Sequence, residues 1–152
     1  MSAPPLFTIG YEQVSAPAVL DTLAGAGVGL LVDVRAVASS RRAGFSKTLL
    51  AGGVASRGID YLHLRGLGTP AEGRHAARAG KYGELRRIYA EHLATPTARE
   101  QLDELAALVA SGRPVCLLCY ERHPEHCHRQ LIAELICERV GVEVAHLAAP
   151  PV

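Results

Sequence analysis

The stretch Gly29-Leu30-Leu31-Val32-Asp33-Val34 decides the fold class, because it is an apolar run interrupted only by one acid near its end. A run without polar alternation is typical of a strand that is covered on both faces, and such strands belong to parallel sheets flanked by helices. Gly25 and Gly27 end a helical pattern just before the run. The sequence therefore predicts a buried strand that the chain enters from a helix.

The segments on either side repeat this alternation. Residues 6–9 form a first apolar run, and Ser15 then precedes a helical pattern with Pro17 in its first turn. Downstream we expect helices over 47–55, around 85–92, around 102–109 and from Cys127 to Gly141, and strands over 59–64, 115–119 and 142–147. Residues 65–83 have no clear period, so we expect a long loop there.

This order of elements predicts an α/β fold. We expect one three-layer domain over residues 1–152, with a mostly parallel sheet of about five strands flanked by helices and joined by right-handed crossovers. The strand order would be rhodanese-like or flavodoxin-like.

Composition narrows the class of protein. The hydrophobic residues, 49% of the chain, occur in short runs, so we expect no membrane span and no membrane partner. The first residues lack the basic segment and apolar stretch of a secretory signal. We therefore expect a cytoplasmic protein whose four cysteines are thiols by default, and we leave its oligomeric state open.

Charge is distributed unevenly along the chain. Residues 35–87 contain eleven Lys or Arg and three acids, whereas the remainder contains five and twelve. This excess of positive charge suggests an anionic small molecule or a nucleic acid as partner, although an ordinary solvated surface can have the same composition. Within this region, segment 39–47 combines cations and hydroxyls, and we assign Arg42 and Lys47 to phosphate contact.

Polar and reactive side chains follow the predicted strands. In an open parallel sheet, ligands bind outside the carboxyl ends of the strands. We therefore predict that a ligand is contacted by Gly10, Tyr11, Asp33, Arg35 and Tyr120. For Asp33 and Arg35, a structural ion pair across the top of the sheet is the alternative.

Cys119, at the end of the strand over 115–119, is the candidate nucleophile. The amino end of the next helix and the side chains of Arg122 and Arg129 would favour its thiolate, lowering a pKa that is ordinarily about 8.5. The alternative is that Cys119 is only the last buried residue of its strand. For Cys116 and Cys137 we expect core packing.

Cys127, His128 and Arg129 open the following helix, so helix-end N–H groups and the guanidinium could capture a phosphate, sulfate or carboxylate. Glu121 or His128 would carry the proton and Cys127 would assist, although Glu121 could instead pair with an arginine. These roles describe a cysteine-dependent transferase or hydrolase that acts on a phosphorylated, nucleotide or nucleic-acid ligand. A nucleic-acid-associated protein, similar to DNA repair proteins and without cysteine chemistry, is the first alternative.

The second alternative is a metal or redox sensor built on Cys119 and Cys127. Six groups that can bind a metal lie within ten residues, namely Cys119, Glu121, His123, His126, Cys127 and His128. Their spacing lacks the paired Cys-x2-Cys knuckles of structural zinc sites, so we expect no metal and no cofactor. Stoichiometric zinc, or a disulfide between the two cysteines, would favour the sensor.

Several motifs occur together in one order. They are Thr8-Ile9-Gly10-Tyr11, Leu31-Val32-Asp33-Val34-Arg35, Gly44-Phe45-Ser46-Lys47, the stretch from Gly58 to Leu64 with Leu67-Gly68 after it, and Leu118-Cys119-Tyr120-Glu121 with Cys127-His128-Arg129. This set resembles a bacterial family of uncharacterised proteins, domain of unknown function 488 (DUF488), over nearly the whole chain. The resemblance implies no particular activity. The chain departs from it at Glu12, where serine is usual, and at residues 36–38, where a proline is expected.

The chain is also loosely similar to rhodanese-type domains, in which an Asp-Val-Arg strand end precedes a later strand that carries a cysteine. Here Asp33-Val34-Arg35 and Cys119 occupy those places. The loop after Cys119 lacks the Cys-x5-Arg pattern, so sulfur-transfer or phosphatase chemistry is implied only as an analogy of fold.

Overall fold

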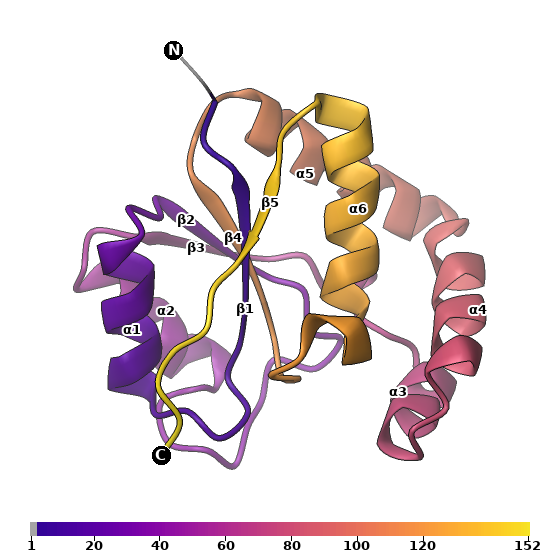
Figure 1. Cartoon of the computed structure of the whole chain (residues 1–152), viewed down its shortest axis with the longest axis horizontal. Helices are drawn as coiled ribbons and strands as arrows, with labels where there is room; N and C mark the ends of the chain where they lie inside the picture. Colours follow the sequence, from indigo (N-terminus) through magenta and orange to yellow (C-terminus); the bar gives the residue numbers. More distant parts are fainter. Residues whose placement is uncertain (1–2) are drawn as a thin grey trace.

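The structure is a computed structural model that describes residues 3–152. Its sheet contains five parallel strands in the order β3-β2-β4-β1-β5 (Figure 1). The strands are β1 (Leu6–Gly10), β2 (Leu30–Asp33), β3 (Asp60–His63), β4 (Val115–Cys119) and β5 (Val144–His146). The predicted α/β class with a sheet of about five strands is confirmed, whereas the 2-1-3-4-5 order of flavodoxin-like sheets is not observed.

Six α-helices and two short 3-10 helices connect the strands. The α-helices are α1 (Ala16–Gly25), α2 (Lys47–Ala55), α3 (Ala71–Arg78), α4 (Tyr82–Leu93), α5 (Pro96–Ala110) and α6 (His128–Val140). The 3-10 helices are η1 (Arg65–Leu67) and η2 (Pro124–His126). None of the helices in residues 3–152 has both the length and the apolar character needed to cross a membrane.

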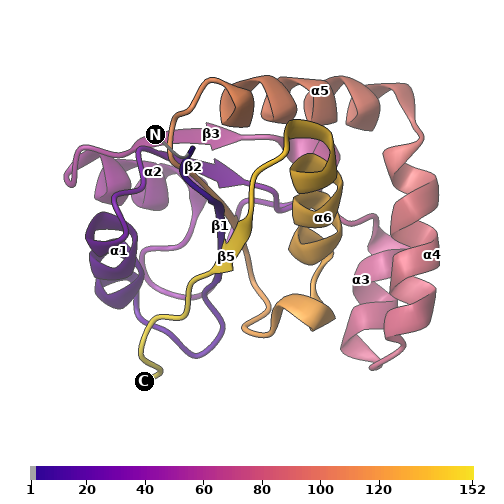
Figure 2. The same cartoon turned by 45° about the horizontal axis from the view of Figure 1, so that its top comes forward.

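The helices cover both faces of the sheet and make a three-layer structure (Figures 1 and 2). On one face, α1 and α2 bury Val19, Leu23, Leu50 and Val54 against the strands. On the other face, α5 and α6 bury Leu105, Val109, Ile132 and Ile136. The pair α3 and α4 lies beyond α6 in both views. The carboxyl ends of the strands lie on the side of the sheet where the α3–α4 pair is found (Figures 1 and 2).

Strand β4 is the centre of the sheet because all five of its residues are buried and it pairs with β1 on one side and β2 on the other. Its register places Gly10 opposite Cys119 and Asp33 opposite Leu118. Parallel pairing aligns the carboxyl ends of the three strands at one edge. The residues that follow β1, β2 and β4 are thereby brought together.

The expected long loop over residues 65–83 is wrong, because this segment contains η1, α3 and the start of α4. Helix α3 buries only Gly73 and Ala76, so no large apolar side chain marks its period in the sequence. Its alanines favour a helix nonetheless. The glycine in this helix allows close packing, since a Cβ at Gly73 would overlap the Thr69 methyl group.

Candidate functional site at the carboxyl ends of the strands

A cavity of about 290 Å³ lies at the carboxyl edge of the sheet. The strand ends and the start of α6 form one side of it, and α3 with the start of α4 forms the other. It is lined by Tyr11, Arg35, Ala36, Val37, Thr69, Arg74, Ala77, Arg78, Leu85, Cys119, Tyr120, Glu121, His126, Cys127 and His128. The cavity therefore includes all four side chains predicted to be catalytic, and three of the eight predicted to bind a ligand.

Two of these side chains are covalently joined. Cys119, at the end of β4, and Cys127, immediately before α6, form a disulfide across eight residues of sequence, with their Cα atoms 7.5 Å apart. Both residues are buried. The ring of His128 lies beside this pair, with Nδ1 3.6 Å from Cys127 Sγ. The structure thus places two sulfurs and one imidazole at the floor of the cavity.

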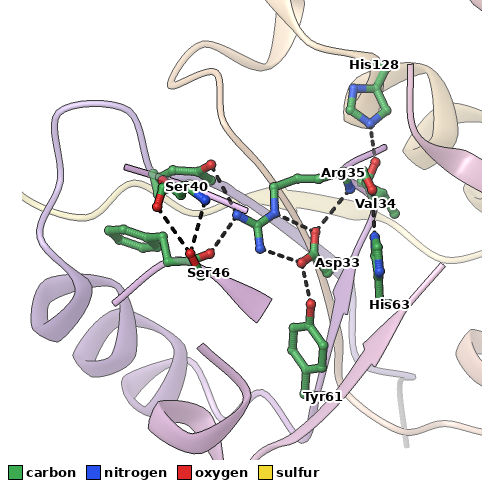
Figure 3. Close-up of polar contacts among 10 residues, drawn as sticks. Asp33, Val34, Arg35, Ser40, Ser46, Tyr61, His63 and His128 are labelled. Atoms are coloured by element: carbon green, nitrogen blue, oxygen red, sulfur yellow. Dashed lines mark hydrogen bonds and ion pairs between the residues drawn. The ribbon is translucent and has the colours of Figure 1, made fainter. Parts of the chain in front are cut away.

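The orientation of His128 is fixed by the backbone of β2. Its Nε2 lies 2.7 Å from the carbonyl oxygen of Val34 (Figure 3). A carbonyl oxygen only accepts, so Nε2 carries the proton and Nδ1 presents its lone pair towards Cys127. Burial lowers the pKa of His128 to about 4. The imidazole is therefore neutral at neutral pH, with its unprotonated nitrogen facing sulfur.

Arg129 is fully buried, and its guanidinium points at the loop after β4. It donates to Thr8 Oγ1 at 3.1 Å, to the carbonyl oxygen of Arg122 at 3.1 Å and to the carbonyl oxygen of Glu121. Its NH1 group also lies 3.2 Å from Cys119 Sγ. Burial lowers the pKa of Arg129 to about 10, so the group remains a cation at neutral pH.

No carboxylate contacts this cation directly, since none of the ion pairs in residues 3–152 includes Arg129. The backbone of the loop and the sulfur of Cys119 surround it instead. All of its contacts are internal and none of its surface is exposed. The prediction that Arg129 captures an anion from solution stays a prediction, and the observed contacts direct the group towards Cys119.

Gly10 lies where β1 passes closest to this loop. A Cβ at Gly10 would overlap the carbonyl oxygen of Glu121 and approach Arg129 NH1 to 2.9 Å. Only glycine leaves room for both groups. Gly10 was predicted to contact a ligand, and the structure places it under the loop, where the absence of a side chain lets Arg129 reach Glu121.

Asp33 and Arg35 form a second buried charged group at the end of β2 (Figure 3). Arg35 donates to the two oxygens of Asp33 from Nε at 2.9 Å and from NH2 at 2.6 Å. It also donates to the Tyr11 hydroxyl and, at 2.7 Å, to the Phe45 carbonyl oxygen. Tyr61, on β3, donates its hydroxyl to the same carboxylate. This geometry is that of the structural ion pair considered as the alternative.

The other predicted ligand-binding residues do not all reach the cavity. Arg42 donates to the Val14 carbonyl oxygen and lies over the Phe45 ring, while Lys47 is exposed at the start of α2. Tyr120 lines the cavity, is 44% exposed and makes a T-shaped contact with the Tyr11 ring. A ligand in the cavity would therefore meet Tyr120 without meeting Lys47.

Glu121 is half-buried at the cavity, and burial followed by the nearby charge of Glu12 raises its pKa. Glu12 directly follows Tyr11 after the end of β1. Its Oε1 accepts a hydrogen bond at 3.0 Å from the backbone N–H of Arg122. Glu12 therefore holds the loop after β4.

Sequence reasoning missed the cations on α3. Arg74 and Arg78 line the cavity opposite the cysteines, and Arg74 NH1 donates at 2.8 Å to the Thr69 carbonyl oxygen. His126, on η2, stacks on Tyr82 with ring centroids 4.2 Å apart, which ties the loop to α4. The spacing of four between the two arginines places them on one face of a helix. That signal becomes visible only once residues 71–78 are recognised as helical.

The family comparison agrees with the resemblance in sequence. The model of the family described as "Domain of unknown function DUF488" matches residues 15–136, which is most of the chain. The chain therefore belongs to the DUF488 family. Comparison with curated proteins found no match, and comparison with solved structures found none.

Proposed function

We propose that this member of the DUF488 family is a thiol-dependent protein in which Cys119 and Cys127 act as a redox pair, with Cys119 as the attacking thiol. The observation that carries the proposal is the guanidinium of Arg129, which is buried without a carboxylate and lies 3.2 Å from Cys119 Sγ. A cation in contact with sulfur favours thiolate over thiol. Cys119 is thus the sulfur whose negative charge Arg129 would balance after reduction.

The two cysteines have different surroundings, and this supports separate roles. Cys127 precedes α6 and faces the lone pair of His128 Nδ1, which can accept a hydrogen bond from a neutral S–H group. Cys119 faces Arg129, which can only donate. In the reduced protein we therefore assign the thiolate to Cys119 and the thiol to Cys127.

The proposed reaction is thiol–disulfide exchange. The Cys119 thiolate attacks one sulfur of a substrate disulfide, which forms a mixed disulfide and releases the other half of the substrate as a thiolate. Cys127 then loses its proton and attacks Cys119 Sγ, which closes the internal disulfide and releases the second half. In total the protein loses two electrons and the one proton of Cys127, and the substrate disulfide becomes two thiols by taking up that proton and a second one from water.

Exchange with glutathione disulfide tests the proposal. We expect metal-free, reduced protein to become two mass units lighter per chain in proportion to the thiol product released, with peptide mapping placing the bond between Cys119 and Cys127. The variant C116S/C137S serves as the control and should behave like the wild type, because it lacks only the other two cysteines. A bond that includes Cys116 or Cys137, or no bond in folded protein, would refute the redox pair.

A second proposal concerns an anionic ligand, and the position of Arg74 and Arg78 at the cavity favours it. These two guanidinium groups face the same cavity as Cys119 and form no ion pair among residues 3–152. Nuclear magnetic resonance titration with inorganic phosphate and with a nucleoside monophosphate tests this. R74A/R78A should lose the binding, and R86A/R87A, two exposed positions on α4, should keep it.

The nucleic-acid hypothesis has less support from the geometry. Several cations of the basic region are engaged within the protein, as in the pairs Arg57–Asp21 and Arg87–Glu91. Binding to DNA should weaken steeply as salt is added, because phosphate contacts release counterions. Retention on DNA that does not depend on ionic strength, or no retention at low salt, would exclude this role.

A further inference from the structure

We infer that the reduced protein binds one Zn²⁺ ion through Cys119 Sγ, Cys127 Sγ and His128 Nδ1, with a fourth coordination position open to the cavity. The three ligand atoms lie within 4.8 Å of one another, and all three residues are buried. The site shares its two sulfurs with the proposed redox pair, but it depends on an independent observation, the orientation of His128.

The chemistry of the three donors fits zinc. Thiolate and imidazole are the ligands that Zn²⁺ prefers, and two sulfurs with one nitrogen leave a single position of a tetrahedron free. The sequence argument against a metal was that the spacing of these residues lacks the paired Cys-x2-Cys knuckles of structural zinc sites. The fold removes this objection, because β4 delivers Cys119 while the N-terminus of α6 delivers Cys127, its N-cap residue, and His128, its first residue.

The surroundings of the ligands are those of a metal site. A histidine that binds metal usually donates its other ring N–H to a carbonyl or carboxylate oxygen, which fixes the ring. His128 donates Nε2–H to the Val34 carbonyl oxygen at the end of β2, so Nδ1 is the free nitrogen. Arg129 donates to Cys119 Sγ and would stabilise the thiolate ligand in the same way.

The backbone spacing of the two cysteines also suits an ion held between their reduced sulfurs. Their Cα atoms lie 7.5 Å apart. Disulfides usually join Cα atoms about 4.4–6.8 Å apart, so this backbone spacing is wide for a direct bond. Two thiolates that point at a common ion need not approach each other as closely as bonded sulfurs do.

The open position faces the cavity, which gives the metal access to a ligand. Cys119, Cys127 and His128 all line the cavity, together with Glu121 and His126. Three protein ligands with one position left for water or substrate is the arrangement of catalytic zinc sites rather than structural ones. The inferred ligand class is therefore a small molecule that can coordinate zinc through an oxygen, nitrogen or sulfur atom.

The zinc-bound site and the oxidised, disulfide-bonded site cannot exist in one molecule at the same time. A substrate disulfide that oxidises the pair takes two electrons from the two thiolates, takes up two protons and leaves as two thiols. The protein then holds the Cys119–Cys127 disulfide and has lost two of its three ligands, so Zn²⁺ is released. This coupling, unlike zinc binding itself, rests on the proposed function.

Metal analysis of the full chain tests the inference. Protein reduced with a phosphine, incubated with zinc and passed through a desalting column should retain one zinc per chain by mass spectrometry. C119S, C127S and H128Q should each lower retention at least about tenfold, because removal of supporting groups alone costs zinc sites about that much. C116S/C137S should retain one zinc per chain.

Cobalt gives a second readout that needs no variant. Co²⁺ added to reduced wild-type protein should produce the absorption bands of a thiolate-bound, four-coordinate ion, and added zinc should abolish them. Reduced, folded protein that retains no zinc and shows no such bands overturns the inference, as does zinc retained in folded C119S/C127S. Because glutathione exchange is measured on metal-free protein, failure here leaves that result, and the redox proposal, unaffected.

Discussion

Two buried arginines lie at the same edge of the sheet, and their surroundings differ in one respect. Arg35, after β2, is neutralised by Asp33, which accepts two hydrogen bonds from its guanidinium. Arg129, in α6, meets carbonyl oxygens, a hydroxyl and the sulfur of Cys119, but no carboxylate. The charge of Arg35 is balanced by a carboxylate. The charge of Arg129 is balanced by a contacting anion only when Cys119 is a thiolate.

This difference suggests a structural role for the Asp33–Arg35 pair and a reactive role for the site around Arg129. A buried cation is costly unless an anion compensates it. At Arg35 the compensation is permanent, because Asp33 is buried beside it. At Arg129 the sulfur can supply an anion only when Cys119 is a thiolate, and the charge of Arg129 favours that state. The comparison therefore supports the proposal that Cys119 is the reactive group.

The largest effect on stability should come from breaking the balanced pair. Asp33→Asn leaves the Arg35 cation buried without an anion, and the expected loss is about 3–5 kcal/mol of the free energy of unfolding. Asp60→Asn is the matched control, because its ion pair with Arg113 is exposed and should contribute less than about 1 kcal/mol. Urea denaturation of both variants measures the difference. Similar losses in the two variants would mean that burial of the Asp33–Arg35 pair does not increase its contribution to the free energy of unfolding.

Removal of the unbalanced cation should cost less. Arg129→Met deletes the hydrogen bonds to the loop but strips no carboxylate of a direct ion-pair partner, so we expect a loss of about 1–3 kcal/mol. Urea denaturation of reduced protein gives this number beside that for Asp33→Asn. A larger loss in Arg129→Met than in Asp33→Asn would contradict the claim that no permanent anion depends on Arg129.

A methyl group at Gly10 sharpens the comparison at the loop itself. Gly10→Ala places a Cβ against the Glu121 carbonyl oxygen and Arg129 NH1, so we expect about 1–3 kcal/mol of destabilisation. Gly52→Ala is the control, since Gly52 lies in α2 with open space around it and alanine should stabilise the helix by up to about 1 kcal/mol. Thermal unfolding of both variants checks the opposite signs. Equal shifts in unfolding temperature would show that the loop after β4 can move away from the new methyl group.

The cations of α3 should have the smallest effect on stability. Arg74 and Arg78 are not buried, so R74A/R78A should change the free energy of unfolding by less than about 0.5 kcal/mol. Thermal unfolding measures this in the variant used for phosphate binding. A large loss would assign these arginines to the packing of α3 and would remove the ligand interpretation.

Much of the fold could be predicted because its signals are local. The bounds of β4 and α2 agree with the sequence expectation, and β4 is a continuous apolar run. Helix α1 begins where Ser15 predicts it, and the hydroxyl oxygen of Ser15 accepts a hydrogen bond from the N–H of Ala18. Helix α3 was missed because small residues make its buried face.

The candidate site was predictable in position but not in contacts. The carboxyl-edge rule correctly grouped the residues after β1, β2 and β4. The partners of Arg129 and His128 were not predictable, because Thr8 and Val34 lie 121 and 94 residues away from them. Those distant contacts turn the Arg129 guanidinium towards the protein interior and leave Nδ1 of His128 unprotonated. Sequence spacing alone had suggested an anion site and no metal.

The most direct test of the account compares the two sulfurs one at a time. In metal-free protein that also carries C116S/C137S, the variant C127S leaves Cys119 as the only thiol and C119S leaves Cys127. At neutral pH, reaction with dithiodipyridine should be at least about tenfold faster for Cys119, because Arg129 favours its thiolate. Access alone predicts the reverse, since Cys127 is slightly more exposed. A Cys127 that reacts as fast as Cys119, or faster, would contradict the central claim.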